Sequence, residues 1–248
     1  MFLALPFRDH NPSRKVPYIN YSLIALNIIV FASHSGQENL DSAHVLALNT
    51  IEVINLNRYE TLITSGFLHA DLKHLFFNML FLYLFGDNLE DRLGHFRYLG
   101  FYLLCMIGAS LIHVFSCILF GGLYNPVIGA SGAISGVVGG YFLLFPKAKI
   151  DFLIWIIIFF WVFPLSAWFA LGVWVLLELW DVYTGSFMHN NVATFAHLGG
   201  FFFGLLLIFP LWIRLGGTKF WHETGGKPPN PEKTSDNRPV KIPIVRKR

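Results

Sequence analysis

Long apolar segments recur along this chain, and they constrain its fold more than any other feature of the sequence. A segment of about 20 mainly apolar residues is long enough to cross a bilayer as a helix. Six such windows, bounded by charges, prolines or polar turns, occur in this chain. Hydrophobic residues make up 54% and charged residues only 13% of its 248 residues, which excludes an ordinary soluble enzyme. We therefore expect an all-α polytopic membrane protein, a bundle of six transmembrane helices.

The second window is the least apolar of the six. The predicted spans are Tyr18–Ser33, Lys73–Leu89, Tyr98–Phe120, Pro126–Phe145, Phe152–Trp180 and Val192–Ile213. Several polar residues, among them Lys73 and Asp87, lie near the ends of the second window. A re-entrant or partly buried helix is therefore the alternative for this segment.

Basic residues are unevenly divided between the two sides that six spans would define. Lys and Arg concentrate in the cytoplasmic segments of membrane proteins. Sixteen of the 18 fall on the side that holds both termini, and only Arg58 and Lys73 fall on the other. Both termini are therefore predicted to be cytoplasmic. Residues 1–17 form a short N-terminal segment, residues 18–213 the membrane domain, and residues 214–248 a basic tail whose Gly and Pro content predicts disorder.

Polar side chains inside the predicted spans indicate where function is expected, because placing them in hydrocarbon is costly. Spans two, four and six run in the same direction and carry such residues near the same end. His74 and Asn78 are four residues apart, on one helical face. Ser131 and His197 each lie five residues past the predicted start of their helices, so we expect them at a similar depth.

Small residues predict that spans four and six pack closely. The GxxxG spacing, which lets two helix backbones approach each other in lipid, occurs in both spans. The glycines expected at this contact are Gly129, Gly132, Gly136, Gly200 and Gly204. By itself the spacing indicates packing and nothing more. Because the hydroxyl of Ser131 and the imidazole of His197 lie beside these glycines, we expect the functional site there.

Ser131 and His197 together supply the minimum for nucleophilic acyl transfer. The imidazole takes the hydroxyl proton and later returns it to the leaving group. A carboxylate that would complete a triad is not predicted, because Glu178 and Asp181 are expected near the outer surface, away from the face and depth of His197. The sequence therefore predicts a Ser–His dyad.

Oxyanion donors are expected from the neighbouring second span. His74 and Asn78, together with the backbone N–H of Ser131, could stabilise the charge that develops in the transition state. A metal site is the alternative for His69, His74 and Asp71. Their spacing lacks the HExxH pattern of zinc proteases, so we predict no metal.

The chain resembles the rhomboid family of intramembrane serine proteases from about Thr61 to Phe209. Three motifs carry the resemblance in order: HxxxN from His74 to Asn78, GxSG around Ser131, and AHxxGxxxG around His197. The resemblance implies a rhomboid-like helix bundle. It also implies Ser131 as the nucleophile, His197 as the general base, and His74 and Asn78 as oxyanion partners.

The sequence departs from the family pattern at two places. Many members have Trp-Arg in the first external loop where this chain has Glu60-Thr61, so the contacts that anchor this loop must differ. Some members have a tyrosine four residues after the nucleophile, stacked on the catalytic histidine, where this chain has Ser135. The imidazole must then be oriented differently. Ser135 either bonds to His197 or is a small packing residue, and we favour packing.

The long fifth window is where substrate access is expected. It contains five tryptophans and has Pro164 near its middle, which predicts a kink. The tryptophans are Trp155, Trp161, Trp168, Trp174 and Trp180. The family resemblance implies lateral gating by this helix. The alternative is that the aromatic side chains face lipid or the membrane interfaces.

The predicted function is that of an intramembrane serine endopeptidase, which hydrolyses peptide bonds in or near transmembrane segments through an acyl-enzyme. The alternative is a non-catalytic rhomboid-like protein that binds transmembrane helices, but both Ser131 and His197 are present. A channel or transporter is disfavoured, since the sequence shows neither inverted repeats nor charged residues in mid-membrane.

The expected partners are transmembrane protein substrates and the lipid bilayer. No cofactor, metal or nucleic acid is predicted, because no phosphate loop or dinucleotide fingerprint follows a predicted strand and the tail lacks interleaved aromatics. The oligomeric state is not indicated. The six-span form resembles prokaryotic members, so the bacterial inner membrane is the expected location.

Overall fold

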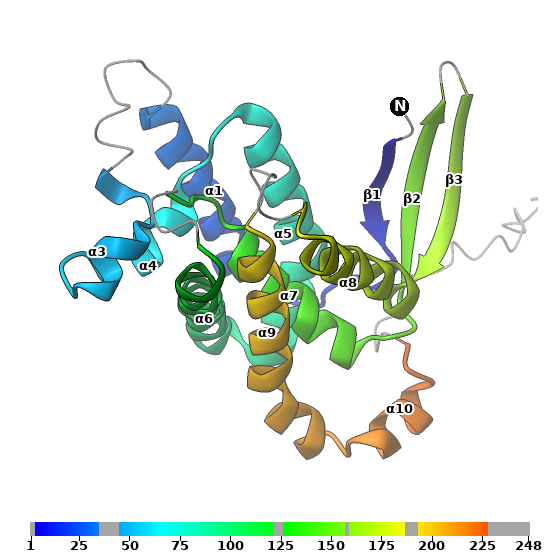
Figure 1. Cartoon of the computed structure of the whole chain (residues 1–248). Coiled ribbons are helices and arrows are strands. Elements are labelled where there is room, and N and C mark those ends of the chain that lie inside the picture. Colours follow the sequence, from blue (N-terminus) through cyan, green and yellow to red (C-terminus); the bar gives the residue numbers. More distant parts are fainter. Residues whose placement is uncertain (1–2, 35–44, 122–125, 157–158, 187–192, 228–248) are drawn as a thin grey trace, which may run out of the picture.

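A mostly helical structure emerges from the computed structural model, which describes residues 3–34, 45–121, 126–156, 159–186 and 193–227 (Figure 1). The helices are α1 (Tyr18–His34), α3 (Thr50–Ile54), α4 (Thr61–Thr64), η2 (Ser65–Phe67), α5 (Leu72–Leu93), α6 (His95–Phe120), α7 (Ser131–Leu144), α8 (Ala167–Thr184), α9 (Thr194–Arg214) and α10 (Thr218–Thr224). The strands are β1 (Leu3–Asp9), β2 (Lys149–Ile156) and β3 (Phe159–Ser166).

Three helices within the described ranges, α6, α8 and α9, are long and apolar enough to cross a membrane. The apolar helices α1 and α7 are shorter, with 17 and 14 residues. Helix α5 carries several charged residues toward its C-terminal end, in keeping with its low predicted hydropathy. The protein is thus a membrane protein with three candidate spans, and the count of six spans stays a prediction.

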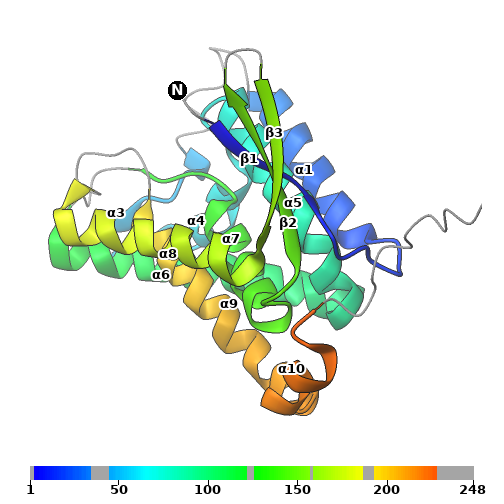
Figure 2. The same cartoon turned by 90° about the vertical axis from the view of Figure 1, so that its right-hand side faces the viewer.

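The three-stranded sheet corrects the prediction of an all-α fold. The strand order is β1-β2-β3, and both pairings are antiparallel. Figures 1 and 2 place the sheet at the side of the helical bundle. Strands β2 and β3 occupy the first half of the window Phe152–Trp180, so the prediction of one long fifth helix is wrong. The helix that remains, α8, begins only at Ala167.

The residue types of this hairpin explain why it is not helical. Residues 149–166 are dominated by β-branched and aromatic side chains, which fit a pleated strand better than a helix. Pro164 would break a helix interior, but it is tolerated in β3 because that strand lies at a sheet edge. Pro6 lies on the other edge strand, β1, next to a register shift. The high hydropathy of this segment therefore does not indicate a transmembrane helix, because its residues form two strands.

The helices α7 and α9 pack backbone against backbone. A Cβ atom added at Gly200 would lie 2.0 Å from the carbonyl oxygen of Gly132, and one at Gly204 would lie 2.0 Å from that of Gly136. Only glycine allows this approach, so the structure brings together the four glycines that the sequence placed at this contact. Helix α7 itself begins at Ser131 and not at Pro126.

Residues after Arg214 continue into the folded part of the protein. The indole Nε1 of Trp221 in α10 donates a hydrogen bond to the carbonyl of Leu143 (3.0 Å), and its ring lies 4.8 Å from that of Trp212. The prediction of disorder is therefore wrong for residues 214–227. Residues 228–248 lie outside the described residues.

Asp9, at the end of β1, joins the sheet to the helices. Its carboxylate accepts hydrogen bonds from Asn88 Nδ2 in α5 (2.9 Å) and from the Tyr141 hydroxyl in α7 (3.1 Å). Burial, together with the nearby carboxylate of Asp87, raises the pKa of Asp9 from 3.8 to about 7. The group is thus neutral in the folded protein under mildly acidic conditions.

Replacing Gly204 by alanine is expected to destabilise the bundle. The added methyl group would overlap the Gly136 backbone, and overpacking of this kind costs about 1–3 kcal/mol or more. The thermal midpoint in detergent should fall clearly. Gly172→Ala is the matched control, because a Cβ there meets nothing within 4 Å. Equal midpoints for the two variants would contradict the close approach of α7 and α9.

The free energy of unfolding should fall as the pH rises from about 4 to about 7, because unfolded Asp9 ionises with a pKa near 3.8 while the folded group stays neutral until about 7. The stabilising contribution is complete below pH 3.8 and lost above pH 7. Asp9→Asn should flatten this dependence, since the amide oxygen can accept both hydrogen bonds. Thermal midpoints between pH 4 and 8 measure it, with exposed Glu223→Gln as control. Parallel profiles for wild type and Asp9→Asn would refute the assignment.

Candidate active site

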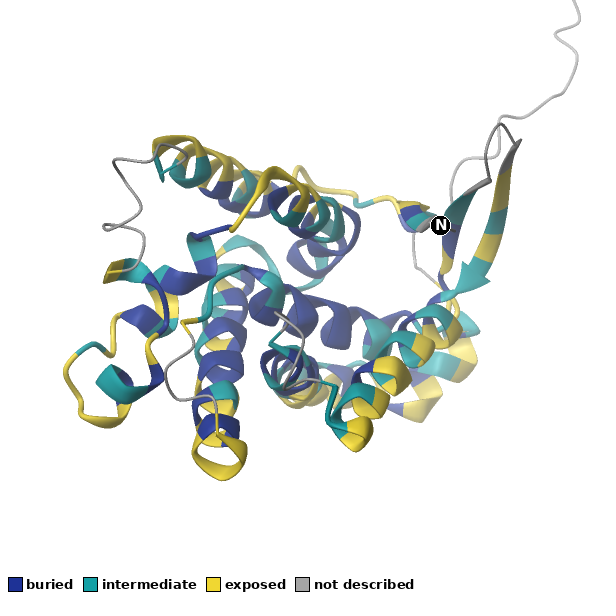
Figure 3. Cartoon of the chain, turned by 45° about the horizontal axis from the view of Figure 1, so that its top comes forward, coloured by how far each residue is buried: buried dark blue, intermediate teal, exposed yellow. Residues whose placement is uncertain are grey.

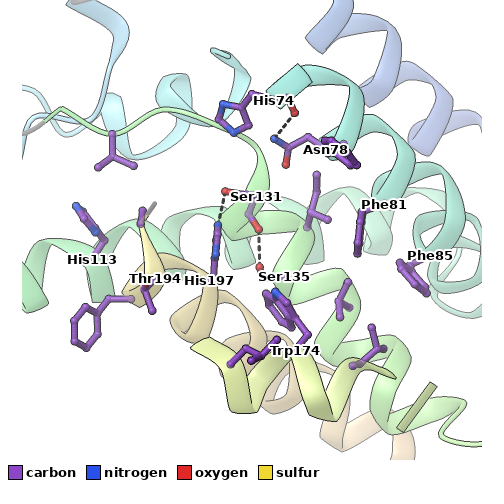
Figure 4. Close-up of a pocket in the computed structure, with 18 of the residues that line it drawn as sticks. His74, Asn78, Phe81, Phe85, His113, Ser131, Ser135, Trp174, Thr194 and His197 are labelled. Atoms are coloured by element: carbon purple, nitrogen blue, oxygen red, sulfur yellow. Dashed lines mark hydrogen bonds between the residues drawn. The ribbon is translucent and has the colours of Figure 1, made fainter. Parts of the chain in front are cut away.

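Ser131 and His197 form a direct hydrogen bond. Ser131 is the first residue of α7 and His197 lies in the first turn of α9. The distance between Ser131 Oγ and His197 Nε2 is 2.9 Å (Figure 4). The glycine contact between α7 and α9 begins at the next residue, Gly132, and therefore holds both side chains at the same depth. The structure thus brings the two predicted reactive groups into hydrogen-bond contact.

A carboxylate contacts the other nitrogen of the same imidazole. Oε1 of Glu178 in α8 lies 2.9 Å from Nδ1 of His197, and the Glu178 side chain is buried. The prediction that Glu178 lies away from the face and depth of His197 is wrong.

The misplaced start of the fifth helix caused this error. A helix from Phe152 would carry Glu178 about 39 Å along its axis, beyond a hydrocarbon core of about 30 Å. Because α8 begins at Ala167, Glu178 lies only about 17 Å from its start. The acidic residue inside an apolar window was the sequence signal that could have identified it.

Trp174 and Ser135 complete the surroundings of the imidazole. The Trp174 ring, one turn before Glu178 on α8, has its centroid 6.2 Å from that of His197. The hydroxyl of Ser135 donates to the backbone carbonyl of Ser131 (2.7 Å), and the side chain is buried (Figure 4). Ser135 is therefore a packing residue that bonds to its own helix, in agreement with the favoured prediction.

His74 lies directly beside the nucleophile. A Cβ atom at Gly129 would be 2.8 Å from Nε2 and Cε1 of His74 and 3.7 Å from Ser131 Oγ. Gly129 therefore makes room for the His74 ring, and it is not part of the α7–α9 contact where the sequence placed it. The backbone N–H of Ala70 donates to His74 Nδ1 (3.5 Å), so in the neutral ring Nε2 carries the proton and faces the site.

Asn78 follows His74 by one turn of α5. Its Nδ2 donates to the backbone carbonyl of His74 (3.1 Å), and both side chains line the cavity that contains Ser131. The N-terminus of α5 is held by Asp71, whose carboxylate accepts the backbone N–H of His74 (2.7 Å). This capping bond positions the residue that carries the predicted oxyanion donor.

The loop before α5 makes local hydrogen bonds and one backbone hydrogen bond to the segment that leads into α7. Glu60 accepts a hydrogen bond from Arg58 (2.6 Å), and buried Thr61 donates to the Arg58 carbonyl (2.6 Å). The backbone N–H of Gly129 donates to the carbonyl of Ser65 (2.9 Å). Glu60 and Thr61 thus bond within the loop, and Ser65 joins the loop to the segment that leads into α7.

Two further histidines lie close to the site. The His69 ring packs edge-on against that of His74, 5.1 Å between centroids. Burial and the neighbouring His74 lower the pKa of His69 to about 4, so His69 is neutral near pH 7. Nε2 of His113 in α6 lies 3.4 Å from the sulfur of Cys117, and His113 also lines the cavity.

No group of three or more His, Cys, Asp or Glu side chains suited to a metal ion occurs among the described residues.

A cavity of about 1380 Å³ extends from Ser131 and His197 between α5 and α8 toward the sheet. Its polar residues gather at one end around the Ser–His pair, and its remaining wall is largely apolar (Figure 4). Phe81 of α5, Leu177 of α8 and Phe163 of β3 belong to that wall. The arrangement suits attack by an activated hydroxyl on a carbonyl carbon of a largely apolar substrate.

The described tryptophan side chains of the fifth window lie in different environments. Trp168 and Trp180 are exposed on α8, and Trp161 is exposed on β3, as expected for side chains that face lipid or an interface. Among the tryptophans of this window whose side chains the structure describes, only Trp174 faces the reactive pair. The side chain of Trp155 lies outside the described part of the chain.

A comparison with protein families finds a match over most of the described helices. The model of the family described as Rhomboid domain matches residues 56–214. This range contains the Ser131–His197 pair, His74, Asn78 and Glu178.

Curated relatives carry rhomboid names as well. The chain is 33% identical over 147 residues to Rhomboid protein 1, mitochondrial, of Saccharomyces cerevisiae. The aligned region is 59% of this chain and 40% of the yeast protein. It is 29% identical over 167 residues to Presenilin-associated rhomboid-like protein, mitochondrial, of Mus musculus, covering 65% and 42%. It is 29% identical over 182 residues to RHOMBOID-like protein 1 of Arabidopsis thaliana, covering 72% and 41%. The chain thus spans about two fifths of the length of these relatives.

Substituting Gly129 by alanine is expected to slow the reaction of Ser131 with a fluorophosphonate, a probe of activated serines. The new methyl group would displace the His74 ring, and Gly129 has a φ of +123° that alanine rarely adopts. Loss of one oxyanion donor costs about 10²–10³-fold in rate. Gly94→Ala is the control for backbone strain, since Gly94 has a φ of +78° with open space around its Cβ. Equally slow labelling in both variants would show that strain alone, and not His74, matters.

Proposed function

Since the chain belongs to the rhomboid family, we propose that it is an intramembrane serine endopeptidase that cleaves transmembrane proteins. The observation that carries this proposal is the 2.9 Å hydrogen bond between Ser131 Oγ and His197 Nε2, next to the His74 ring. A hydroxyl with a base on one side and a donor on the other is the arrangement that acyl transfer needs.

Acylation begins with Ser131 as nucleophile. Its Oγ attacks the scissile carbonyl carbon while His197 Nε2 takes the hydroxyl proton. The oxyanion that forms would be stabilised by His74 Nε2–H, by the Asn78 amide and by the backbone N–H of Ser131, which as the first residue of α7 has no partner within its helix. His197 then gives its proton to the leaving amine as the C–N bond breaks, and an acyl-enzyme remains.

Deacylation uses the same groups with water in place of the serine. His197 Nε2 takes a proton from water, whose oxygen attacks the ester carbonyl. When the ester bond breaks, the proton returns to Ser131 Oγ and the carboxylic acid product leaves. The cycle consumes one water molecule and needs neither a metal nor a cofactor.

The substrates would be transmembrane segments, because the cavity that leads to Ser131 is walled by apolar side chains of α5 and α8. A segment unwound near small residues could enter between these two helices and present its backbone to the site. In this proposal the chain crosses the membrane six times and both termini are cytoplasmic. The relatives named above are eukaryotic, two of them mitochondrial by name, and give no support to the predicted bacterial inner membrane.

Ser131→Ala should abolish both cleavage of a reporter transmembrane substrate and labelling by a fluorophosphonate, because each reaction needs the hydroxyl. His197→Ala should reduce both by about 10²-fold or more, the contribution expected of a general base. The measurement uses protein purified in detergent and reconstituted in liposomes, with thermal midpoints to show that each variant is folded.

Ser22→Ala serves as the matched control, since Ser22 is an exposed serine whose hydroxyl donates to the Tyr18 carbonyl within α1. This variant should cleave and label like wild type. Labelling that survives Ser131→Ala would mean that another serine reacts and would refute the site. A folded wild-type protein that neither cleaves nor labels would support a non-catalytic binder of transmembrane helices instead.

A further inference from the structure

We propose that Glu178 is a positioning residue of the active site, which acts through His197 as the third member of a Ser131–His197–Glu178 chain. This inference rests on the proposed function. Glu178 Oε1 lies 2.9 Å from His197 Nδ1, and His197 Nε2 lies 2.9 Å from Ser131 Oγ. One imidazole thus bridges a carboxylate on α8 and a hydroxyl on α7.

The carboxylate determines which ring nitrogen holds the proton. An ionised carboxylate only accepts hydrogen bonds, so His197 Nδ1 must carry the hydrogen that it donates to Glu178. Nε2 of the neutral ring is then the unprotonated nitrogen, and it accepts the hydrogen bond from the Ser131 hydroxyl. This is the tautomer that proton transfer from serine requires, and without Glu178 the ring could adopt the other one.

The negative charge also favours the state that forms during catalysis. When His197 takes the serine proton it becomes an imidazolium, with Glu178 as its counter-charge. Both side chains are largely buried, at 15% exposed for His197 and 10% for Glu178, and an ion pair is stronger away from water. The pair therefore stabilises the charged intermediate more than the neutral resting ring.

Glu178 and Trp174 hold the imidazole from the same side. They are four residues apart on α8, hence on one helical face, and the Trp174 ring centroid lies 6.2 Å from that of His197. At position 135, where some members of the family have a tyrosine against the histidine, this chain has a serine bonded to its own helix. In this chain position 135 does not contact the ring in that way, and Glu178 and Trp174 of α8 contact it instead.

The remaining oxygen of Glu178 points to a function beyond helix packing. Oε2 is buried and has no hydrogen-bond partner among the described residues. A buried carboxylate that served only to join α8 to α9 would be an expensive choice, because a half-paired charge in an apolar environment is destabilising. A role in orienting His197 and in stabilising its charged form would account for a buried carboxylate at this position.

Three variants test this role: Glu178→Gln, Glu178→Ala and Asp181→Asn. Asp181 is the matched control, an acidic residue on the same helix less than one turn further on. For each protein, kcat and KM are measured on a reporter transmembrane substrate, together with the rate of fluorophosphonate labelling of Ser131. The small probe reports on the nucleophile independently of how a transmembrane segment is bound.

Glu178→Ala should lower kcat and the labelling rate together, by at least about tenfold, and by up to about 10⁴-fold if the wrong tautomer dominates. KM should change little. Glu178→Gln keeps the shape of the side chain and an acceptor oxygen but loses the charge, so it should retain more activity than alanine. Asp181→Asn should match wild type in all three quantities.

Proton NMR of histidine-labelled protein in micelles supplies a readout besides activity. The hydrogen-bonded Nδ1–H of His197, assigned by its absence in His197→Ala, should shift or disappear in Glu178→Ala and persist in Asp181→Asn. The Gln variant, which keeps the contact without the charge, should show an intermediate position.

Two results from the variants would overturn the role of Glu178. Unchanged kcat and labelling in folded Gln and Ala variants would show that His197 is positioned without it. A rise in KM with unchanged labelling would show that the residue serves substrate binding. A folded wild-type protein that neither cleaves nor labels would overturn the proposed function, and with it this role. The two failures can be distinguished, because failure of the proposed function is seen in the wild type alone and failure of the Glu178 role is seen only in the variants.

Discussion

Direct contact between two helix backbones is the constraint on which the rest of this structure depends. Where Gly200 and Gly204 of α9 meet Gly132 and Gly136 of α7, even a methyl group would overlap a carbonyl oxygen. In lipid, such contact must supply much of the association energy, because apolar side chains gain little by leaving one apolar solvent for another. The same contact places the first turns of both helices side by side. Figure 3 shows how completely the centre of the bundle is buried around it.

Within that apolar centre, the polar groups form one connected chain across three helices. Ser131 on α7, His197 on α9 and Glu178 on α8 each satisfy part of the next residue's hydrogen-bonding capacity. An isolated imidazole or carboxylate at this depth would be costly, whereas a connected set offsets part of the desolvation of each member. The close α7–α9 contact places Ser131 and His197 side by side, and α8 adds Glu178 to the other nitrogen of the ring.

The sequence predicted the parts of the molecule that depend on local pattern, and failed where tertiary context decides. Hydropathy located α1, α5, α6 and α9 to within about one helical turn, and the spacing of small residues located the contact beside the reactive pair. Hydropathy cannot distinguish an apolar hairpin from the first half of a long helix, because it depends on the residue types and not on the backbone conformation. Because of that error, the sequence predicts Glu178 away from His197 and does not identify it as the third polar residue of the site.

Helix α8 connects substrate access to the geometry of the reactive groups. It is the most exposed of the three candidate spans, with 17% of its apolar window buried against 44% for α6 and 39% for α9. Its position therefore depends less on packing than theirs does, and Trp174 and Glu178 provide two of its few specific contacts with the core. The same helix contributes Phe169, Trp174 and Leu177 to the wall of the cavity that contains Ser131. In the proposed enzyme, substrate access and the orientation of His197 would therefore depend on the same face of α8.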